Sequence, residues 1–216
     1  MKTLIQTENA QPHDNSPALN CQLTEKSTFC FKSKSISLSP YLKMLDLHSS
    51  PYNGSVHYTP QLHTAYLNPE IQLVSWLPSF ANLTLAANYH QLGTRQEINE
   101  RADYLLDCFS CTAIRDRLPH FISPLERKYL LIARTLMLEP QLLFLDTPFI
   151  GLNRQETEKL TEKLVTLAKQ CQLTLVTNET GSNFIQLAQA HIIYCDTQKF
   201  HYFSHWNDFQ RYLKVT

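Results

Sequence analysis

The chain has 216 residues, of which 43% are hydrophobic and 18% charged, and its 19 basic side chains balance 19 acidic ones. This length suits one large domain, and the zero net charge argues against a nucleic-acid partner, because such binding depends on clustered lysine and arginine. Only four glycines are present, and the first of them is Gly54. A glycine-rich loop that cradles phosphate therefore cannot lie in the first fifty residues.

Hydropathy and cysteine usage predict where the protein works. The longest apolar run, near 129–138, is interrupted by Arg134 and falls short of the ~18 residues that a membrane span needs. The N-terminal segment has no apolar stretch typical of a secretory signal peptide. Six cysteines are scattered without a disulfide framework. We therefore expect a cytoplasmic protein with reduced thiols and no direct membrane insertion.

The first half of the chain is expected to contain short strands followed by helices. Ser39 is expected to cap its helix with Pro40 in the first turn, and Thr94 and Glu97 have the spacing of a capping box. In chain order the predicted elements are a strand over 28–32, a helix over 39–47, strands over 55–58 and 70–76, and helices over 82–92 and 94–109.

In the second half of the chain, helices alternate with apolar strands. Ser123 with Glu126, and Asn153 with Glu156, have the spacing of capping boxes. Continuous apolar runs between helices are typical of buried parallel strands, so the pattern predicts an α/β fold with a largely parallel sheet. The predicted elements are helices over 123–138, 153–168, 183–190 and 206–213, and strands over 142–146, 173–177, 191–195 and 199–203.

The stretch HFISPLERKYLLIARTLMLEPQLLFLDTPFIGLN resembles the core of the ATP-binding subunit of ABC transporters. In that family a Leu-Ser-Gly-Gly-Gln signature opens a helix, and a Walker B strand ends in Asp-Glu-Pro. Ile122 and Ser123 match the start of the signature, but Pro-Leu-Glu replaces Gly-Gly-Gln. Asp146 matches the Walker B aspartate, while Thr147 replaces the glutamate that follows it. LDTPFIGLN is most similar to the Walker B region of bacterial envelope lipid and lipopolysaccharide transporters.

The resemblance extends to both sides of this stretch. Aligned from SSPYNGS, it places Leu38 at the Walker A lysine and Ser39 at the magnesium-binding serine, within about two residues. Ser75 falls near the glutamine of the glutamine loop, and His13 near the aromatic residue that stacks on adenine. Asn178 replaces the switch histidine.

The resemblance implies a RecA-like core of the P-loop-NTPase type, with a largely parallel sheet and a small N-terminal β subdomain. It also implies an inserted helical subdomain. We expect a single ABC ATPase-like domain over 1–216, with its core at about 1–76 and 123–216 and the helical subdomain at about 77–122. This subdomain and the segment 75–90 are where the family contacts the permease.

The replacements predict a lost ATP site. A phosphate loop needs backbone N–H groups and a lysine, and Lys34 cannot supply this function from a loop of Ser, Ile and Leu that lacks the glycine geometry. A capping box at Ser123 puts the Glu126 carboxylate where the family places a γ-phosphate. Thr147 cannot activate water, and Asn178 cannot relay a proton. We therefore expect no catalytic residue, and vestigial nucleotide-binding positions at Leu38, Ser39, Ser75, Ser123, Asp146 and His13.

Three functional hypotheses remain open. The first is a pseudo-ATPase subunit without a cofactor or metal, held at the inner face of the membrane by a permease and paired with an active ATP-binding subunit or with itself. The alternative is a divergent ATPase that slowly hydrolyses Mg-ATP, with Asp146 and Ser39 holding the metal. A freestanding interaction protein is the third. Asp146 also has a plain structural interpretation, as a contact to the loop that follows it.

The remaining residues with reactive side chains are expected to be structural. Cys108 and Cys111 form a lone CxxC on a helix and are expected to act as small buried hydrophobes. The nine histidines show no metal-ligand spacing.

Overall fold

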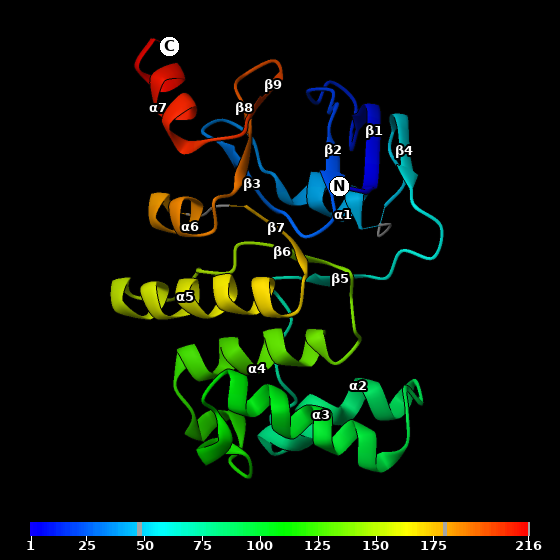
Figure 1. Ribbon diagram of the computed structural model, residues 1–216, viewed down its shortest axis with the longest axis vertical. Coiled ribbons are helices and arrows are strands. Elements are labelled where there is room, and N and C mark those ends of the chain that lie inside the picture. The colour runs from blue at the N-terminus through cyan, green and yellow to red at the C-terminus, as the bar shows by residue number, and fades with distance from the viewer. Residues whose placement is uncertain (47–48, 179–180, 216) are drawn as a thin grey trace.

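The computed structural model describes residues 1–46, 49–178 and 181–215, and Figure 1 shows the arrangement of its elements. The strands are β1 Thr3–Gln11, β2 Gln22–Thr24, β3 Thr28–Ser33, β4 Asn53–Tyr58, β5 Thr64–Leu67, β6 Leu142–Leu145, β7 Thr174–Asn178, β8 His191–Cys195 and β9 Phe200–Phe203. The helices are α1 Ser39–Leu45, α2 Ser79–Tyr89, α3 Arg95–Cys108, α4 Pro124–Leu136, α5 Arg154–Gln170, α6 Ser182–Leu187 and α7 Trp206–Val215, with 3₁₀ turns at Thr112–Ile114 and Pro119–Phe121.

The main sheet has six strands in the order β5-β6-β7-β3-β8-β9. The pairings from β5 to β8 are parallel, and β9 closes one edge as an antiparallel hairpin partner of β8. Because both faces of a parallel sheet are covered, successive residues of one strand enter different cores. Leu143 and Leu145 pack toward the helices α2 to α5, while Leu142 and Phe144 pack toward α1 and the small sheet. The predicted α/β class with a largely parallel sheet is confirmed.

A second, antiparallel sheet of three strands in the order β2-β1-β4 covers α1, as Figure 1 shows at the upper right. Leu4 and Ile5 of β1 are buried in the same core as Leu42 of α1. The small β elements expected near the N-terminus are therefore present. The strand β1 itself was not predicted, because most of its residues are polar and its few apolar residues do not form an evident strand pattern.

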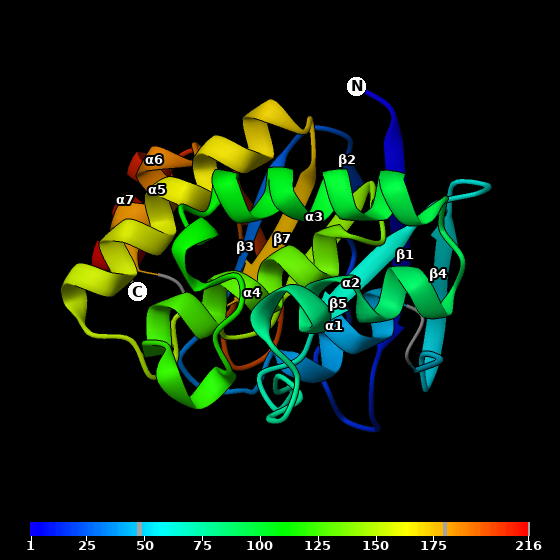
Figure 2. The same ribbon diagram turned by 90° about the horizontal axis from the view of Figure 1, so that it is seen from below.

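The segment between β5 and β6 is mostly helical. Figure 2, seen from below, shows α2 and α3 in front of α4, on which both pack. The predicted apolar face of α3 is buried, including Ala102 and Leu106, and its capping box of Thr94 and Glu97 is present. Cys111 is buried and Cys108 is half-buried, and both are free thiols. α3 packs against α4 through its apolar face, because this contact removes apolar side chains from water.

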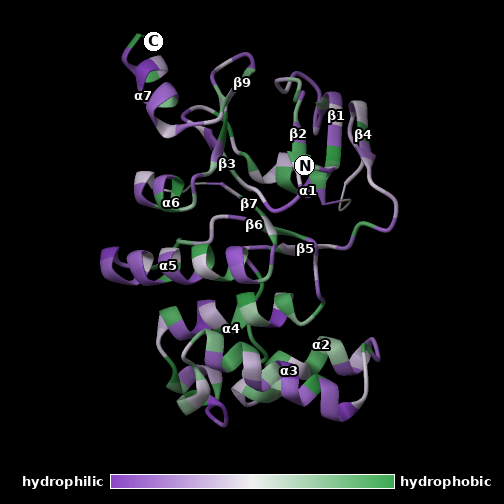
Figure 3. Ribbon diagram, viewed as in Figure 1, coloured by the Kyte–Doolittle hydropathy of each residue, from purple (hydrophilic) through white to green (hydrophobic). Residues whose placement is uncertain are grey.

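Figure 3 shows how hydropathy follows this arrangement: hydrophobic residues gather in the central strands, and hydrophilic and hydrophobic residues alternate along α4 and α5. The capping boxes predicted at Ser123 and Asn153 are both formed, so the two helices begin where the sequence predicted. Leu160, Leu164 and Leu167 of α5 are buried, as an amphipathic helix on a sheet requires.

The predicted strand over 70–76 is wrong. The strand in this region is β5, Thr64–Leu67, which pairs with β6. Pro69 has no N–H to continue the ladder, so the strand ends before it. Further along, the Asn82 side chain accepts a hydrogen bond from Val74 N–H at 2.7 Å and donates one to Val74 O at 3.0 Å. The backbone of this apolar segment is thus held by a buried side chain and not by a sheet.

Candidate functional site

A buried carboxylate, that of Asp146, lies at the carboxyl end of β6 and has three side-chain partners. Ser39 Oγ and Asn178 Nδ2 each donate to Oδ1 at 2.8 Å, and the Tyr66 hydroxyl donates to Oδ2 at 2.5 Å. Asp146 is only 3% exposed. Parallel strands end at one edge of the sheet, so residues distant in sequence meet there. The structure thus brings Ser39, Asp146 and Asn178 together, and adds Tyr66 to them.

Ser39 reaches this carboxylate because it is the first residue of α1. The expectation that Ser39 caps the helix is wrong: the N-cap residue is Leu38, no side chain caps it, and Pro40 lies in the first turn as expected. The Ser39 hydroxyl forms a charge-assisted hydrogen bond with Asp146 instead, and this is stronger than a neutral cap. The predicted helix over 39–47 ends at Leu45, and Leu47 lies outside the described residues.

Tyr66, in the edge strand β5, is a site residue that the sequence did not predict. Burial and the hydrogen bond to Asp146 both raise the pKa of its phenol. The hydroxyl therefore stays protonated at physiological pH and donates its hydrogen bond to one oxygen of the Asp146 carboxylate. Its strand, β5, is short, and the strand predicted in this region was placed over 70–76 instead.

Asn178, at the end of β7, links Asp146 to the residue that follows it. Its Oδ1 accepts the Thr147 N–H at 2.6 Å, while its Nδ2 donates to Asp146. Thr147 has a left-handed backbone with φ of 46°, which is costly for a β-branched residue. Its hydroxyl is buried and has no hydrogen-bond partner among the described residues. The turn after β6 is thus shaped around the Asn178 amide. Glu179, in the switch stretch, lies outside the described residues.

The loop over 33–38, where the resemblance places Walker A, is closed on itself. Ser33 Oγ accepts the N–H groups of Ser35 at 3.1 Å and Ile36 at 3.2 Å. Leu38 is 1% exposed and packs in the core with α1. All residues of this loop are described, and none of them has a positive φ. Two N–H groups are therefore committed to a serine hydroxyl, and the residue at the lysine position lies away from solvent.

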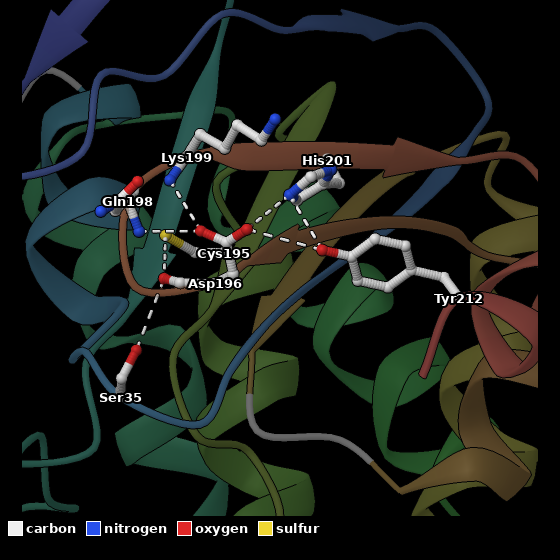
Figure 4. Close-up of polar contacts among 7 residues, drawn as sticks. All are labelled: Ser35, Cys195, Asp196, Gln198, Lys199, His201 and Tyr212. Atoms are coloured by element: carbon white, nitrogen blue, oxygen red, sulfur yellow. Dashed lines mark hydrogen bonds and ion pairs between the residues drawn. The ribbon is translucent and has the colours of Figure 1, made fainter. Parts of the chain in front are cut away.

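The hairpin between β8 and β9 supports this loop. Ser35 Oγ donates to the backbone oxygen of Asp196 at 3.4 Å, as Figure 4 shows. The Asp196 carboxylate accepts the N–H groups of Gln198 and Lys199 at 2.8 and 2.9 Å and lies 2.7 Å from His201 Nε2. These hydrogen bonds, the backbone ones first, hold the pKa of Asp196 well below its usual range. The turn that contacts the loop is therefore held together by the Asp196 carboxylate.

The start of α4, where the resemblance places the signature, has the predicted capping box. Ser123 N–H donates to Glu126 Oε2 at 2.7 Å, and Glu126 N–H donates to Ser123 Oγ at 3.2 Å. These bonds satisfy two of the N–H groups that otherwise point from a helix N-terminus toward an anion.

Two of the predicted site residues are not brought to Asp146. His13 is exposed in a turn closed by its own contacts with Ser16, and this turn is tied to α1 by the Tyr41 hydroxyl, which donates to Pro17 O at 2.7 Å. Ser75 is exposed and lines a groove of about 340 Å³ beside α4. Neither residue makes a hydrogen bond with the carboxylate.

The residues present do not fit Mg-ATP. Ser39 and Asp146 are oxygen ligands of the type that Mg²⁺ prefers, but both are engaged with protein partners. Among the described residues, no group of three or more His, Cys, Asp or Glu side chains could hold a metal ion. In the loop over 33–38, the N–H groups of Ser35 and Ile36 are already bound to Ser33 Oγ. The site as built is a buried carboxylate whose two oxygens accept hydrogen bonds from three uncharged side chains.

The fold is that of the ATP-binding domain of ABC transporters. CbiO1 from Clostridium perfringens, part of the ABC transporter complex CbiONQ, superposes with a TM-score of 0.84 at 16% identity over 100% of this chain and 94% of that one. A dimeric ATP-binding cassette solved with ADP and phosphate gives a TM-score of 0.76 at 18% identity, over 92% of this chain and 97% of that one.

Relatives in sequence point to the same class. The lipopolysaccharide export system ATP-binding protein LptB of Haemophilus influenzae is 33% identical over 98 residues, which are 45% of this chain and 41% of LptB. An uncharacterized ABC transporter ATP-binding protein of the same organism is 30% identical over 99 residues, 46% of this chain and 44% of that protein. The match thus spans less than half the length of these relatives, and the chain matches no protein-family model. Its homologues are ABC transporter ATP-binding proteins, which confirms the resemblance.

No helix in the described part of the chain is both long enough and apolar enough to cross a membrane.

Proposed function

We propose that this chain is a pseudo-ATPase: a non-catalytic ABC-type subunit that serves as a structural or regulatory partner in a membrane transporter. The observation that carries the proposal is the Asp146 carboxylate, whose two oxygens accept hydrogen bonds from Ser39, Tyr66 and Asn178. A magnesium ion here would have to displace these donors, and each charge-assisted bond is worth about 1.5–3 kcal/mol. The side chains of Ser39, Tyr66 and Asn178 bind the carboxylate oxygens that a metal ion would otherwise contact.

The chemistry of hydrolysis is missing at the two neighbouring positions. Attack on a phosphoryl group needs a residue that orients or deprotonates water, and Thr147 and Asn178 have no group that takes up a proton at neutral pH. The Asn178 amide is also committed on both sides, to Thr147 N–H and to Asp146. We therefore assign no catalytic residue and no resident cofactor.

An exposed apolar surface supports a permease as partner. Trp76 is 77% exposed and Phe121 is 65% exposed, and they are the chain neighbours of Ser75 and His120, which line the groove beside α4. Exposed aromatic residues next to a groove are typical of an interaction site. The resemblance implies that this region contacts a permease. The subunit would then lie in the cytoplasm at the inner face of the membrane, without inserting into it.

The assembly and cargo follow from the relatives. A dimer is recorded for the ATP-binding cassette described above, so we propose that this chain pairs with an active ATP-binding subunit or with a second copy of itself. LptB is named for lipopolysaccharide export, and the resemblance of the Walker B region points the same way. We therefore place the transporter among those that move lipids of the bacterial envelope.

Equilibrium binding of Mg-ATP tests the proposal. We expect no saturable binding at micromolar ATP by calorimetry, and no phosphate release above the level of the Asp146→Ala variant. Saturable binding at micromolar ATP that is abolished in Asp146→Ala would overturn the pseudo-ATPase assignment. It would favour the second candidate, a divergent ATPase that slowly hydrolyses Mg-ATP. The observation on its side is the 2.8 Å contact between Ser39 and Asp146, the two positions that resemble the magnesium ligands of the family.

Purification from detergent-solubilised membranes tests the partner. We expect the chain to co-purify with a multi-span membrane protein and a motif-complete ATP-binding protein, and the variant Trp76→Ala/Phe121→Ala to lose both. Tyr52→Ala/Tyr202→Ala is the matched control, since these aromatic residues are 66% and 51% exposed outside the groove. Recovery of the wild-type chain only as a soluble monomer would support a freestanding interaction protein instead.

A further inference from the structure

A large cavity lies at the edge of the main sheet opposite Asp146. Its volume is about 950 Å³, and it is lined where β3 and β8 begin, where α5 and α6 end, and where α7 starts. Asp146 follows the carboxyl end of β6, and parallel strands have their carboxyl ends on one edge and their amino ends on the other. The cavity is therefore separate from the site discussed above, and a volume of this size accommodates a small organic ligand.

The charged side chains of this cavity have one sign. Lys26 and Lys169 line it, together with the histidines His191 and His205, and no aspartate or glutamate is found among its described lining residues. In a chain with equal numbers of acidic and basic side chains, this composition is a local excess of positive charge. Cavity walls of low dielectric strengthen the attraction of such a site for an anion.

His191 contributes its ring to the wall of the cavity. Its Nδ1 is buried and makes no hydrogen bond with any described residue. The ring is held by stacking, with its centroid 5.2 Å from that of Phe29 and 5.6 Å from that of Tyr202. Because Nδ1 is closed off from solvent, another edge of the ring borders the cavity.

The other walls are apolar. Val165 and Leu173 on the α5 side, Ile185 of α6 and Trp206 of α7 line the same space. Trp206 has an indole ring, the side chain best suited to covering a flat apolar group. Lysine side chains beside aromatic and aliphatic walls favour a ligand that combines an acidic group with an apolar body.

We propose that this cavity binds a small organic anion with a planar apolar body, such as an aryl sulfonate, carboxylate or phosphate. Lys26 and Lys169 attract the acidic group, the His191 ring forms part of the wall, and the plane of the ligand lies against Trp206. The site does not depend on the proposed pseudo-ATPase function, because it shares no lining residue with the Asp146 cluster.

Energy transfer to a fluorescent probe provides the test. The chain has two tryptophans, so Trp76→Phe leaves Trp206 as the only donor. Anilinonaphthalene sulfonate carries the sulfonate and the aryl body, and N-phenylnaphthylamine is its uncharged counterpart. We expect saturable transfer from Trp206 to the sulfonate and much weaker transfer to the neutral probe. Equal affinity for both probes, or no transfer in Trp76→Phe, would overturn the proposal.

Charge variants complete the test. In the Trp76→Phe background, Lys26→Gln/Lys169→Gln is expected to weaken sulfonate binding at least about tenfold, because the loss of a single charge-assisted contact already corresponds to about tenfold. Lys159→Gln/Lys214→Gln removes the same charge from exposed positions outside the cavity and is expected to leave binding unchanged. Equal losses in both lysine pairs would show a long-range charge effect and contradict a site in the cavity.

Discussion

The hydroxyl of Ser39 donates a hydrogen bond to Oδ1 of Asp146 across 2.8 Å, although 107 positions of the chain separate the two residues. The same oxygen accepts a bond from Asn178, so the starts and ends of three elements meet at one atom. The crossover topology of the sheet produces this meeting. The function of this site depends on its side chains, and here Ser39, Asn178 and Asp146 form hydrogen bonds with one another.

Removing the Asn178 amide should destabilise the protein. Asn178→Leu keeps the approximate size of the side chain but removes two hydrogen bonds, one to a buried carboxylate and one from the strained Thr147. We expect the free energy of unfolding to fall by about 2–4 kcal/mol, measured by urea denaturation. Asn88→Leu, at an exposed position of α2, should change it by less than about 0.5 kcal/mol. Similar values for the two variants would mean that the Asp146 cluster does not support the fold.

The capping box of α4 gives a second stability prediction. Ser123→Ala removes the side-chain acceptor for Glu126 N–H and should lower the free energy of unfolding by about 1 kcal/mol. Ser182→Ala, at the first residue of α6, serves as the control, because no cap hydrogen bond is assigned to it. An unchanged midpoint of urea unfolding in Ser123→Ala would show that something other than the serine shapes this helix end.

Glycine scarcity predicts a stabilising substitution. Gln172 follows the end of α5 with a φ of 50°, a backbone conformation that glycine adopts without steric cost. Gln172→Gly should therefore raise the free energy of unfolding by roughly 0.5–1 kcal/mol. Gln170→Gly, at the last residue of the helix, should instead lower it, by up to about 1 kcal/mol. Thermal unfolding of both variants checks the opposite signs, and a loss of stability in Gln172→Gly would contradict the strain argument.

Asp196 predicts how stability depends on pH. Its pKa is lower in the folded protein, so its contribution is fully present above the unfolded pKa of about 3.9 and is lost as the pH falls through the folded value. The stability difference between wild type and Asp196→Asn should be constant from pH about 7 to 5 and shrink below about 4. Urea unfolding at each pH measures this difference. A difference that stays constant in acid would mean that the carboxylate gains nothing from its partners.

Local signals in the sequence were sufficient for the central strands and for most helix positions, although α2 begins at Ser79 and the predicted helix began at 82. The capping boxes at Thr94, Ser123 and Asn153 depend on residues three positions apart, and all three are formed. The strand over 70–76 was predicted wrongly, because an apolar run does not reveal whether its backbone will pair with a sheet or with a side chain such as Asn82. Tyr66 escaped prediction for a related reason, since its role depends on which strand lies beside β6.

By itself, the sequence determined the α/β class, the family resemblance and the absence of glycines from the first fifty residues, because these follow from composition, periodicity and short motifs. Only the tertiary structure decided how the altered positions are used. It showed that Ser33 binds the N–H groups of its own loop, and that the Asp146 carboxylate is shared among Ser39, Tyr66 and Asn178. Hydrogen bonds between residues far apart in the chain depend on strand order and register, which no local pattern records.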